Sequence, residues 1–320
     1  RVLAGQTGVN PETARRVMNV VEETGYVPNP SASALARRRG PRTGLVHRAV
    51  GVAFVRVPLQ GGLPYIRQEV YDGILDAAKD ADLSVSTCRL RPEDLARTSL
   101  SATFQEKVDG FLIHPGYAAE ASLFQFSFPA VIFGSHPVSG ADIPTVEGDN
   151  LTGMRALIDH LHGLGHRRFE FVSQDYLHTP FQERARVAEN YCATLGATFR
   201  AYGPFRDRVT DYVLEFTSRK VGERPTAVLC GADSSAVELM HSFLSAGVRV
   251  PDDVSVVGFD GYPWAANSVP PLTTWRPDWH ALGEMSLNAL LSRIAGKRVP
   301  ARTLVGGELI IRQSTGRAVA

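Results

Sequence analysis

Two aspartates, Asp233 and Asp260, follow apolar, strand-like runs of the sequence at 226–231 and 254–259. Ligands of open α/β sheets lie beyond the carboxyl ends of the strands, so both carboxylates are candidates for a binding site. To act as a general acid and base, the two would have to share one substrate in a defined geometry, which the sequence does not specify. Asp233 has an alternative role as the cap of the helix predicted over 233–246.

Three closely spaced histidines, His160, His162 and His166, could in principle hold a metal ion. Solvated loop histidines are the alternative, and the sequence favours it. The phosphate loop G-x-x-x-x-G-K-[ST], the dinucleotide fingerprint G-x-G-x-x-G, the nucleophile elbow G-x-S-x-G and the zinc helix H-E-x-x-H do not occur in the chain. The sequence therefore predicts a protein that is not an enzyme and that carries no metal and no cofactor.

Composition indicates a folded protein of two domains. The chain has 320 residues, of which 44% are apolar and 21% charged, which suffices for a buried core. An uninterrupted apolar run of about 18 residues, which a membrane-spanning helix would need, does not occur. The first residues do not resemble a signal peptide, and the three cysteines (Cys88, Cys192, Cys230) are too far apart for a disulfide framework or a metal cluster. We therefore expect a cytoplasmic protein without membrane association.

Charge is distributed unevenly along the chain. Residues 1–48 hold eight arginines against three glutamates, a net charge of +5, whereas the remainder holds 26 basic and 30 acidic side chains, a net charge of −4. A small basic segment joined to a mildly acidic body is typical of a nucleic-acid-binding module fused to another domain. A solvated basic tail is the alternative that charge alone leaves open.

The basic segment is patterned for helices. Asn10 can cap a helix that has Pro11 at its first position and Glu12 beside its positive end, and Gly25 supplies the stop. A second start at Asn29-Pro30 opens the stretch SASALARRR, which is too poor in large apolar residues to hold a helix without a partner. The stretch GPRTG at 40–44 has the composition of a linker.

From Val50 onward, apolar strands alternate with helices. We predict strands at 50–55, 83–88, 110–114, 129–134, 168–173, 226–231 and 254–259, and helices at 66–81, 93–106, 151–163, 181–195, 208–220 and 233–246. Continuous apolar runs are typical of parallel strands that helices cover on both faces. The fold class is therefore α/β, with doubly wound parallel sheets, and a break near 145–150 suggests two lobes.

Several stretches resemble the LacI/GalR family of bacterial transcriptional regulators over nearly the whole chain. VNPETARRVMNVVEETGYVPN is similar to the third helix of the family's helix-turn-helix head, and PSASALARR to its hinge helix. GDNLTGMRALIDHLHGLGHRR, PTAVLCGADSSAVELMHSFLSAGVRVPDDVSVVGFDG and PPLTTWRPDWHALGEMSLNALL resemble its regulatory core. The resemblance implies a partial helix-turn-helix head, a hinge, and a two-lobed core like that of periplasmic sugar-binding proteins. The corresponding boundaries are 1–28 for the head, 29–48 for the hinge and linker, 49–147 plus 276–305 for the first lobe, and 148–275 plus 306–320 for the second.

The resemblance also implies an effector site. Arg184 matches the arginine that grips the effector in many relatives, and Asp233 and Asp260 match carboxylates that contact it. An arginine fork can hold two adjacent hydroxyls or a carboxylate, although a surface ion pair is the alternative for Arg184. Tyr65 and Phe205 fall where relatives place aromatic residues of the cleft, and both could equally be core residues. A sugar is the family's usual ligand, but Gly134, Glu189-Asn190 and Pro277 depart from the family pattern and leave the ligand's identity open.

For DNA, the resemblance implies contacts from the head and hinge. Arg1 matches an arginine that often reads a guanine edge, and the helices that would precede it in the family's head are missing here. Leu35 matches the hinge leucine that wedges into the minor groove, with Ala32 beside it; packing against the core is the alternative. Asn29 and Ser31 could contact the backbone or groove, and Asn29 could instead only cap a helix.

The sequence thus predicts an effector-responsive repressor that acts as a homodimer on a near-palindromic operator. Its effector would be a small polar molecule, a sugar by family default, and effector binding would control operator binding allosterically. The alternative is a solute-binding protein of the same core fold that serves transport or chemoreception. That alternative would need a secretion signal and would have no use for the hinge.

Overall fold

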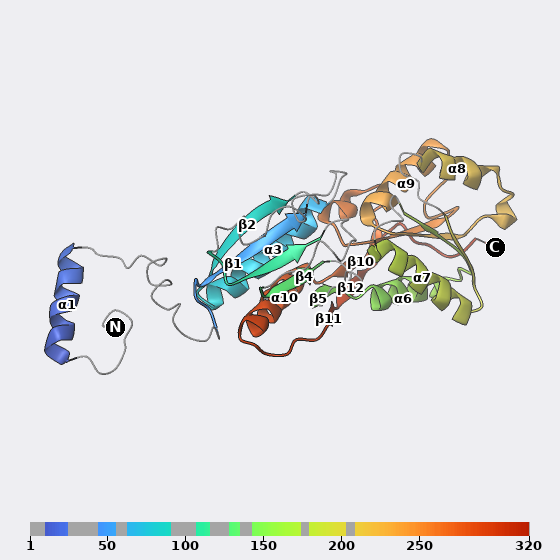
Figure 1. The fold of residues 1–320 in the computed structure, drawn as a ribbon. Coiled ribbons are helices and arrows are strands. Elements are labelled where there is room, and N and C mark those ends of the chain that lie inside the picture. The colour runs from blue at the N-terminus through green and yellow to red at the C-terminus, as the bar shows by residue number, and fades with distance from the viewer. Residues whose placement is uncertain are drawn as a thin grey trace.

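The computed structural model of the protein describes residues 10–24, 44–55, 63–90, 107–115, 128–134, 143–173, 179–202 and 209–319. Two six-stranded sheets form the centres of two lobes that follow one another in Figure 1. Ahead of them, helix α1 spans Pro11–Thr24, and the backbone N–H of Glu12 donates to Asn10 Oδ1 at 2.9 Å. The predicted helix start at Asn10 is therefore confirmed.

The first lobe is built on a wholly parallel sheet with the strand order β11-β5-β4-β3-β1-β2. The strands are β1 (Ala49–Val55), β2 (Ser84–Leu90), β3 (Gly110–His114), β4 (Ala130–Phe133), β5 (Thr145–Gly148) and β11 (Arg302–Val305). Helices α3 (Leu63–Asp80) and α10 (Trp279–Ile294) pack against each other and against this sheet. The helix predicted over 93–106 lies outside the described residues.

Helices α3 and α10 cross at two glycines. A Cβ atom on Gly73 would overlap the carbonyl oxygen of His280, and one on Gly283 would overlap the carbonyl oxygen of Val70. The two backbones therefore approach more closely than any larger residue would allow, and this contact joins residues more than 200 positions apart in the sequence.

The second lobe has the strand order β12-β10-β9-β8-β6-β7. Its strands are β6 (Arg168–Val172), β7 (Thr198–Ala201), β8 (Ala227–Cys230), β9 (Ser255–Phe259), β10 (Thr273–Pro277) and β12 (Gly307–Ile310). Its helices are α6 (Asn150–Gly163), α7 (Thr179–Thr194), α8 (Val209–Ser218) and α9 (Asp233–Ser245), with 3₁₀ turns η3 (Val221–Glu223) and η4 (Pro263–Asn267). The expected parallel arrangement holds except at β12, which runs antiparallel to β10.

Alternate residues of the second lobe's strands pack into two separate hydrophobic cores, one on each face of the sheet. Phe171 and Leu229 pack under α6 and α7, whereas Val172 and Val228 pack under α8 and α9. Because helices cover both faces, neighbouring residues of one strand are all buried, which produces the continuous apolar runs seen in the sequence.

The chain passes between the lobes three times: after β5, after β10, and between β11 and β12. These crossings are hydrogen-bonded to one another, since Asp149 N–H donates to the Val305 carbonyl at 2.8 Å and Asp278 N–H to the Gly306 carbonyl at 2.9 Å. The boundary expected at 276 falls inside β10, because that strand stays in the second sheet through Pro277.

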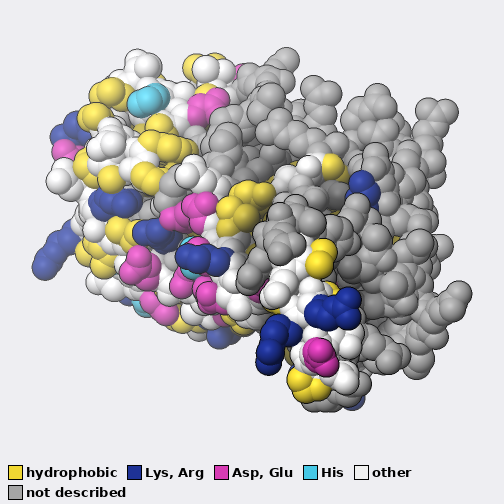
Figure 2. Space-filling model, turned by 90° about the vertical axis from the view of Figure 1, so that its left-hand side faces the viewer, with side chains coloured by type: hydrophobic (Ala, Val, Ile, Leu, Met, Phe, Trp, Pro, Cys, Tyr) yellow, Lys and Arg dark blue, Asp and Glu magenta, His cyan; other side chains and the backbone are white. Residues whose placement is uncertain are grey.

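The face of the molecule on the side of α1 has mixed charge where it is described. Figure 2 shows lysine and arginine side chains lying next to aspartates and glutamates on that face. In the described part of the chain, no helix is long and apolar enough to span a membrane.

Candidate functional site

The candidate site lies at the carboxyl edge of the second sheet. Strands β6, β8 and β9 are parallel neighbours, so their carboxyl ends meet at one edge. Gly231 follows β8, Asp260 follows β9, and α7, which comes after β6 in the chain, carries Arg184. The topology therefore brings residues from three separate parts of the sequence to the same place.

Arg184 is buried, with only 5% of its surface exposed, and its guanidinium is held on several sides. Its Nε donates to Asn150 Oδ1 at 2.8 Å, and its Nη1 donates to the Gly231 carbonyl at 2.6 Å and approaches Asp260 Oδ1 at 3.4 Å. The guanidinium carbon lies 3.6 Å from the centre of the Phe259 ring, a cation–π contact. The alternative of a surface ion pair is wrong, because both partners of this ion pair are buried.

Asp260 is held in an uncommon backbone conformation. Its φ is +123°, a region that side-chain-bearing residues rarely adopt, and residues held in this way cluster at functional sites. Its N–H donates to the Trp275 carbonyl, and its own carbonyl accepts from the indole N–H of Trp279, both at 2.8 Å. These two bonds fix the turn and direct the carboxylate toward Arg184.

Burial raises the pKa of Asp260 to about 8; the charge of Arg184 opposes this rise, and nearby Asp233 adds to it. Burial also lowers the pKa of Arg184 from its usual value, while Asp260 raises it. A buried carboxyl whose pKa lies near neutrality, beside a fixed cation, is characteristic of functional sites.

Asp233 stabilises the turn at Asp260 through hydrogen bonds inside the lobe. It is fully buried, and its Oδ2 accepts from the Tyr262 N–H at 2.8 Å while its Oδ1 accepts from the Thr274 hydroxyl at 2.6 Å. Burial raises its pKa to about 6, and the hydrogen bond from Thr274 lowers it. The alternative role as a helix cap is wrong: Ala232 is the capping residue of α9 and makes no side-chain cap bond, and the Asp233 carboxylate ties the loop after β9 to β10.

The remaining predicted contacts are not described in the structure. Tyr65 belongs to α3, but its side chain lies outside the described residues, as does Phe205. The predicted DNA contacts also lie outside them: Arg1, Asn29, Ser31, Ala32 and Leu35.

The histidine group does not form a metal site. Among the described residues, no group of three or more His, Cys, Asp or Glu side chains is placed so that it could hold a metal ion. His166 is buried rather than solvated, because its Nε2 bonds the Gly316 carbonyl at 3.0 Å and so fastens the C-terminal segment to the lobe. Burial lowers the pKa of His166 below its usual value.

Two polar residues of the site were not predicted, Asn150 and Trp279. Asn150 follows β5 and holds Arg184, and Trp279 begins α10 and holds the Asp260 carbonyl. The rule that ligand-site residues follow strands would have found Asn150 if the short polar strand TVEG at 145–148 had been recognised.

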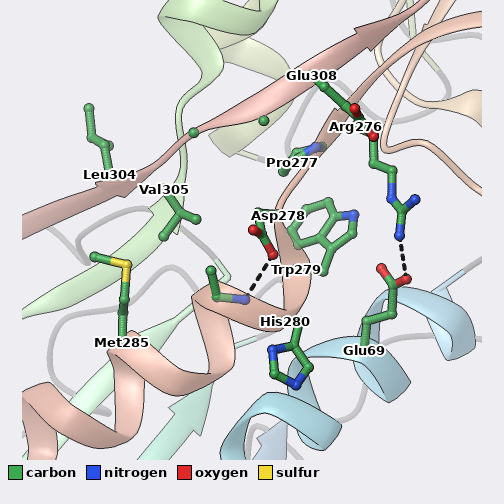
Figure 3. A pocket seen from close by; sticks show the side chains of 13 residues that line it. Glu69, Arg276, Pro277, Asp278, Trp279, His280, Met285, Leu304, Val305 and Glu308 are labelled. Carbon is green, nitrogen blue, oxygen red and sulfur yellow. Dashed lines mark hydrogen bonds and ion pairs between the residues drawn. The ribbon is translucent and has the colours of Figure 1, made fainter.

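A cavity of about 650 Å³ lies where the chain crosses between the lobes (Figure 3). Arg276 of β10 reaches across it to Glu69 of α3, with Nη2 and Oε1 2.8 Å apart. Trp279 lines this cavity as well and connects it to the turn at Asp260. The other lining residues are Pro277, Asp278, His280, Ala281, Met285 and the segment 304–308.

Two sheets joined by three crossings, with buried polar residues at one carboxyl edge, define a two-lobed periplasmic-binding-protein-like core. Residues 158–315 match the family model described as a periplasmic binding protein-like domain. The fold is similar to that of the lac repressor dimer bound to operator and the anti-inducer ONPF, with a TM-score of 0.76 at 23% identity, covering 99% of this chain and 94% of that one. The transcriptional regulator CelR in complex with cellobiose matches with a TM-score of 0.70 at 22% identity, covering 98% and 94%.

Sequence similarity leads to the same class. The arabinose metabolism transcriptional repressor of Geobacillus stearothermophilus is 25% identical over 98% of this chain and 89% of its own length. In sequence and fold, the chain is similar to the LacI/GalR family of transcriptional regulators over nearly its whole length. The predicted resemblance to this family and the predicted fold class are thereby confirmed, and the relatives are regulators of transcription rather than enzymes.

Proposed function

We propose that this regulator is a repressor whose core binds a small polar effector of the sugar class, and that the effector controls binding of a homodimer to a near-palindromic operator. In this proposal the protein acts in the cytoplasm, where its DNA target lies. The observation that carries the proposal is the buried pair of Arg184 and Asp260 at the sheet edge that faces the lobe crossings.

The chemistry of this pair suits a polyol. The guanidinium offers a planar fork of donors, and the carboxyl of Asp260 can accept a hydrogen bond when ionised or donate one when protonated. The buried Phe259 ring lies under the guanidinium and holds it in place through the cation–π contact. The guanidinium of Arg184 already has the Asp260 carboxyl as its partner, which favours a neutral ligand over an anion.

Other residues take supporting roles in the proposal. Asp233 positions the turn that presents Asp260, since its own oxygens already accept hydrogen bonds inside the lobe. Tyr65 and Phe205 are proposed to cover the ligand. The proposed DNA contacts are Arg1, Asn29, Ser31, Ala32 and Leu35.

A repressor is favoured over a solute-binding protein by the extent of the similarity. The alignment with the arabinose repressor spans 98% of the chain and so extends beyond the two-lobed core into the basic segment. A solute-binding protein would share the core alone.

The proposal is tested by calorimetric titration of four neutral sugars, L-arabinose, D-ribose, cellobiose and sucrose. We expect one of them to bind with one site per subunit. Removing one partner of a buried charged hydrogen bond costs about 2–5 kcal/mol, so Asp260→Ala and Arg184→Ala should each weaken binding by at least about tenfold. Asp253→Ala removes a partly exposed carboxylate of the same lobe and serves as the matched control, with unchanged affinity. Unchanged affinity in both site variants would place the ligand elsewhere.

A further inference from the structure

An ion pair joins the two lobes next to the candidate site. Arg302 lies on β11, in the first sheet, and Glu183 lies on α7, in the second lobe. Arg302 Nη2 donates to Glu183 Oε1 at 2.9 Å, while its Nε donates to the buried Glu147 of β5. Glu147 therefore anchors the arginine in the first lobe, and the other end of its fork reaches the second.

The second oxygen of Glu183 continues this connection inward. Glu183 Oε2 accepts from Asn150 Nδ2 at 2.6 Å, and Asn150 Oδ1 accepts from Arg184 Nε at 2.8 Å. Asn150 is only 4% exposed, and its amide has one donating and one accepting end. Its orientation is therefore set by Glu183 on one side and Arg184 on the other.

We propose that Asn150 and Glu183 are positioning residues that couple the guanidinium of Arg184 to the lobe contact made by Arg302. This inference rests on the proposed function, because it takes Arg184 to be the residue that holds the effector. A ligand that draws the guanidinium toward itself competes with Asn150 for Nε. The amide then shifts, its bond to Glu183 weakens, and Glu183 changes its hold on Arg302 of the other lobe.

The coupling works in the opposite direction as well. A movement of the first lobe relative to the second disturbs the ion pair between Arg302 and Glu183. Through Asn150, that disturbance reaches the Nε–H of Arg184, which is the donor that the effector would use. Coupling between two sites is reciprocal for binding free energies, so lobe position and ligand affinity change each other by the same factor. The connection thus supplies a physical route between the effector site and the arrangement of the lobes.

The first test uses the ligand-free protein and measures the hydrogen bonding of the Arg184 Nε–H, which lies at the opposite end of the connection from Arg302. The Arg184 Nε–H signal is assigned in an arginine side-chain ¹H–¹⁵N spectrum by its loss in Arg184→Lys, and its exchange with water is measured. Loss of a hydrogen bond of ordinary net strength should speed this exchange by about three- to tenfold in Glu183→Gln and in Arg302→Met, although neither side chain touches that atom. Arg249→Met breaks an exposed ion pair of the second lobe and is the matched control, with unchanged exchange.

Two results of this test would overturn the proposal. Exchange at Arg184 that is unchanged in both variants would show that the connection does not hold the guanidinium. Exchange that responds to Glu183→Gln but not to Arg302→Met would remove the link between lobes. If Arg302→Met fails to fold, Arg302→Lys replaces it, because lysine keeps the charge but cannot bridge two carboxylates with a planar fork.

The second test uses whichever of the four sugars binds the wild-type protein. Glu183→Gln should change its dissociation constant by about three- to tenfold, whereas Glu69→Gln, which breaks the ion pair that Glu69 makes with Arg276 between the lobes, should change it less than twofold. Equal effects of the two variants would mean that any contact between lobes suffices, and would overturn the specific route. If none of the sugars binds, the proposed ligand class fails, while the exchange measurement still decides whether the connection exists.

Discussion

The raised pKa of Asp260 predicts a defined pH dependence of stability. Burial raises the pKa of this carboxyl from 3.8 to about 8 in the folded protein, whereas in the unfolded chain it returns to its ordinary value. The folded state therefore binds the proton more tightly than the unfolded state. The resulting stabilisation is fully present below the unfolded pKa and is lost as the pH rises through about 8.

The size of this change in the free energy of unfolding follows from the interval between the unfolded and the folded pKa of Asp260. At pH 6 the folded protein still holds this proton while the unfolded chain has lost it, so the free energy of unfolding falls by up to about 1.4 kcal/mol per pH unit, and the fall slows toward pH 8 as the folded protein also releases the proton. The total between pH 6 and pH 8 is about 2 kcal/mol. Asp233, whose pKa is raised to about 6, makes most of its contribution at lower pH and adds little here.

The assay compares wild type with Asp260→Asn by urea denaturation at pH 6, 7 and 8, followed by tryptophan fluorescence and far-ultraviolet circular dichroism. The difference in unfolding free energy between the two proteins should shift by about 2 kcal/mol across this range, in the direction that favours wild type at pH 6. Asp253→Asn is the control, because a hydrogen bond from Arg249 lowers the pKa of Asp253 and keeps it ionised throughout. A difference for Asp260→Asn that stays constant to within about 0.5 kcal/mol would show that Asp260 is ionised throughout, and would refute the reasoning.

Two further predictions concern the first lobe and the hinge. Gly283→Ala should lower the free energy of unfolding by about 1–3 kcal/mol in urea denaturation, since its Cβ would overlap the Val70 carbonyl, whereas Gly163→Ala, with open space around its Cβ, should have little effect. Leu35→Ala should weaken DNA binding in gel-shift titrations and leave calorimetric melting unchanged, because the proposed wedge acts only on DNA; melting that falls while DNA affinity holds would make Leu35 a packing residue.

The strands that lie between covering helices were predictable, because both of their faces are buried. Runs such as GFLIH and AVIF are apolar throughout for this reason. The strands that were not predicted are short or partly polar: β7 is an edge strand with mostly exposed side chains, and β5 contains the buried Glu147. A charged residue inside a strand becomes compatible with burial only through a partner, and the partner of Glu147 is Arg302, 155 positions away.

Only part of the candidate site could be predicted from the sequence. Arg184 and Asp260 were identified by resemblance, and Asp260 also by its position after a strand. The roles of Asn150, Glu183 and Arg302 could not be predicted, because each depends on a contact between distant segments; Glu183 and Arg302 are 119 positions apart. For Asp233 the sequence suggested a ligand contact or a helix cap, because this residue follows a strand. In the structure its carboxylate accepts a hydrogen bond from the loop after β9 and holds that loop.

The central claim is that a small polar ligand bound at Arg184 and Asp260 controls DNA binding, and one measurement tests it most directly. The full-length protein is titrated against a fluorescent duplex that it has itself selected from a random library, with and without a saturating concentration of the sugar that binds it. We predict that the ligand changes DNA affinity by roughly 5- to 150-fold and that Asp260→Ala abolishes this change. The same DNA affinity with and without bound ligand would contradict the account.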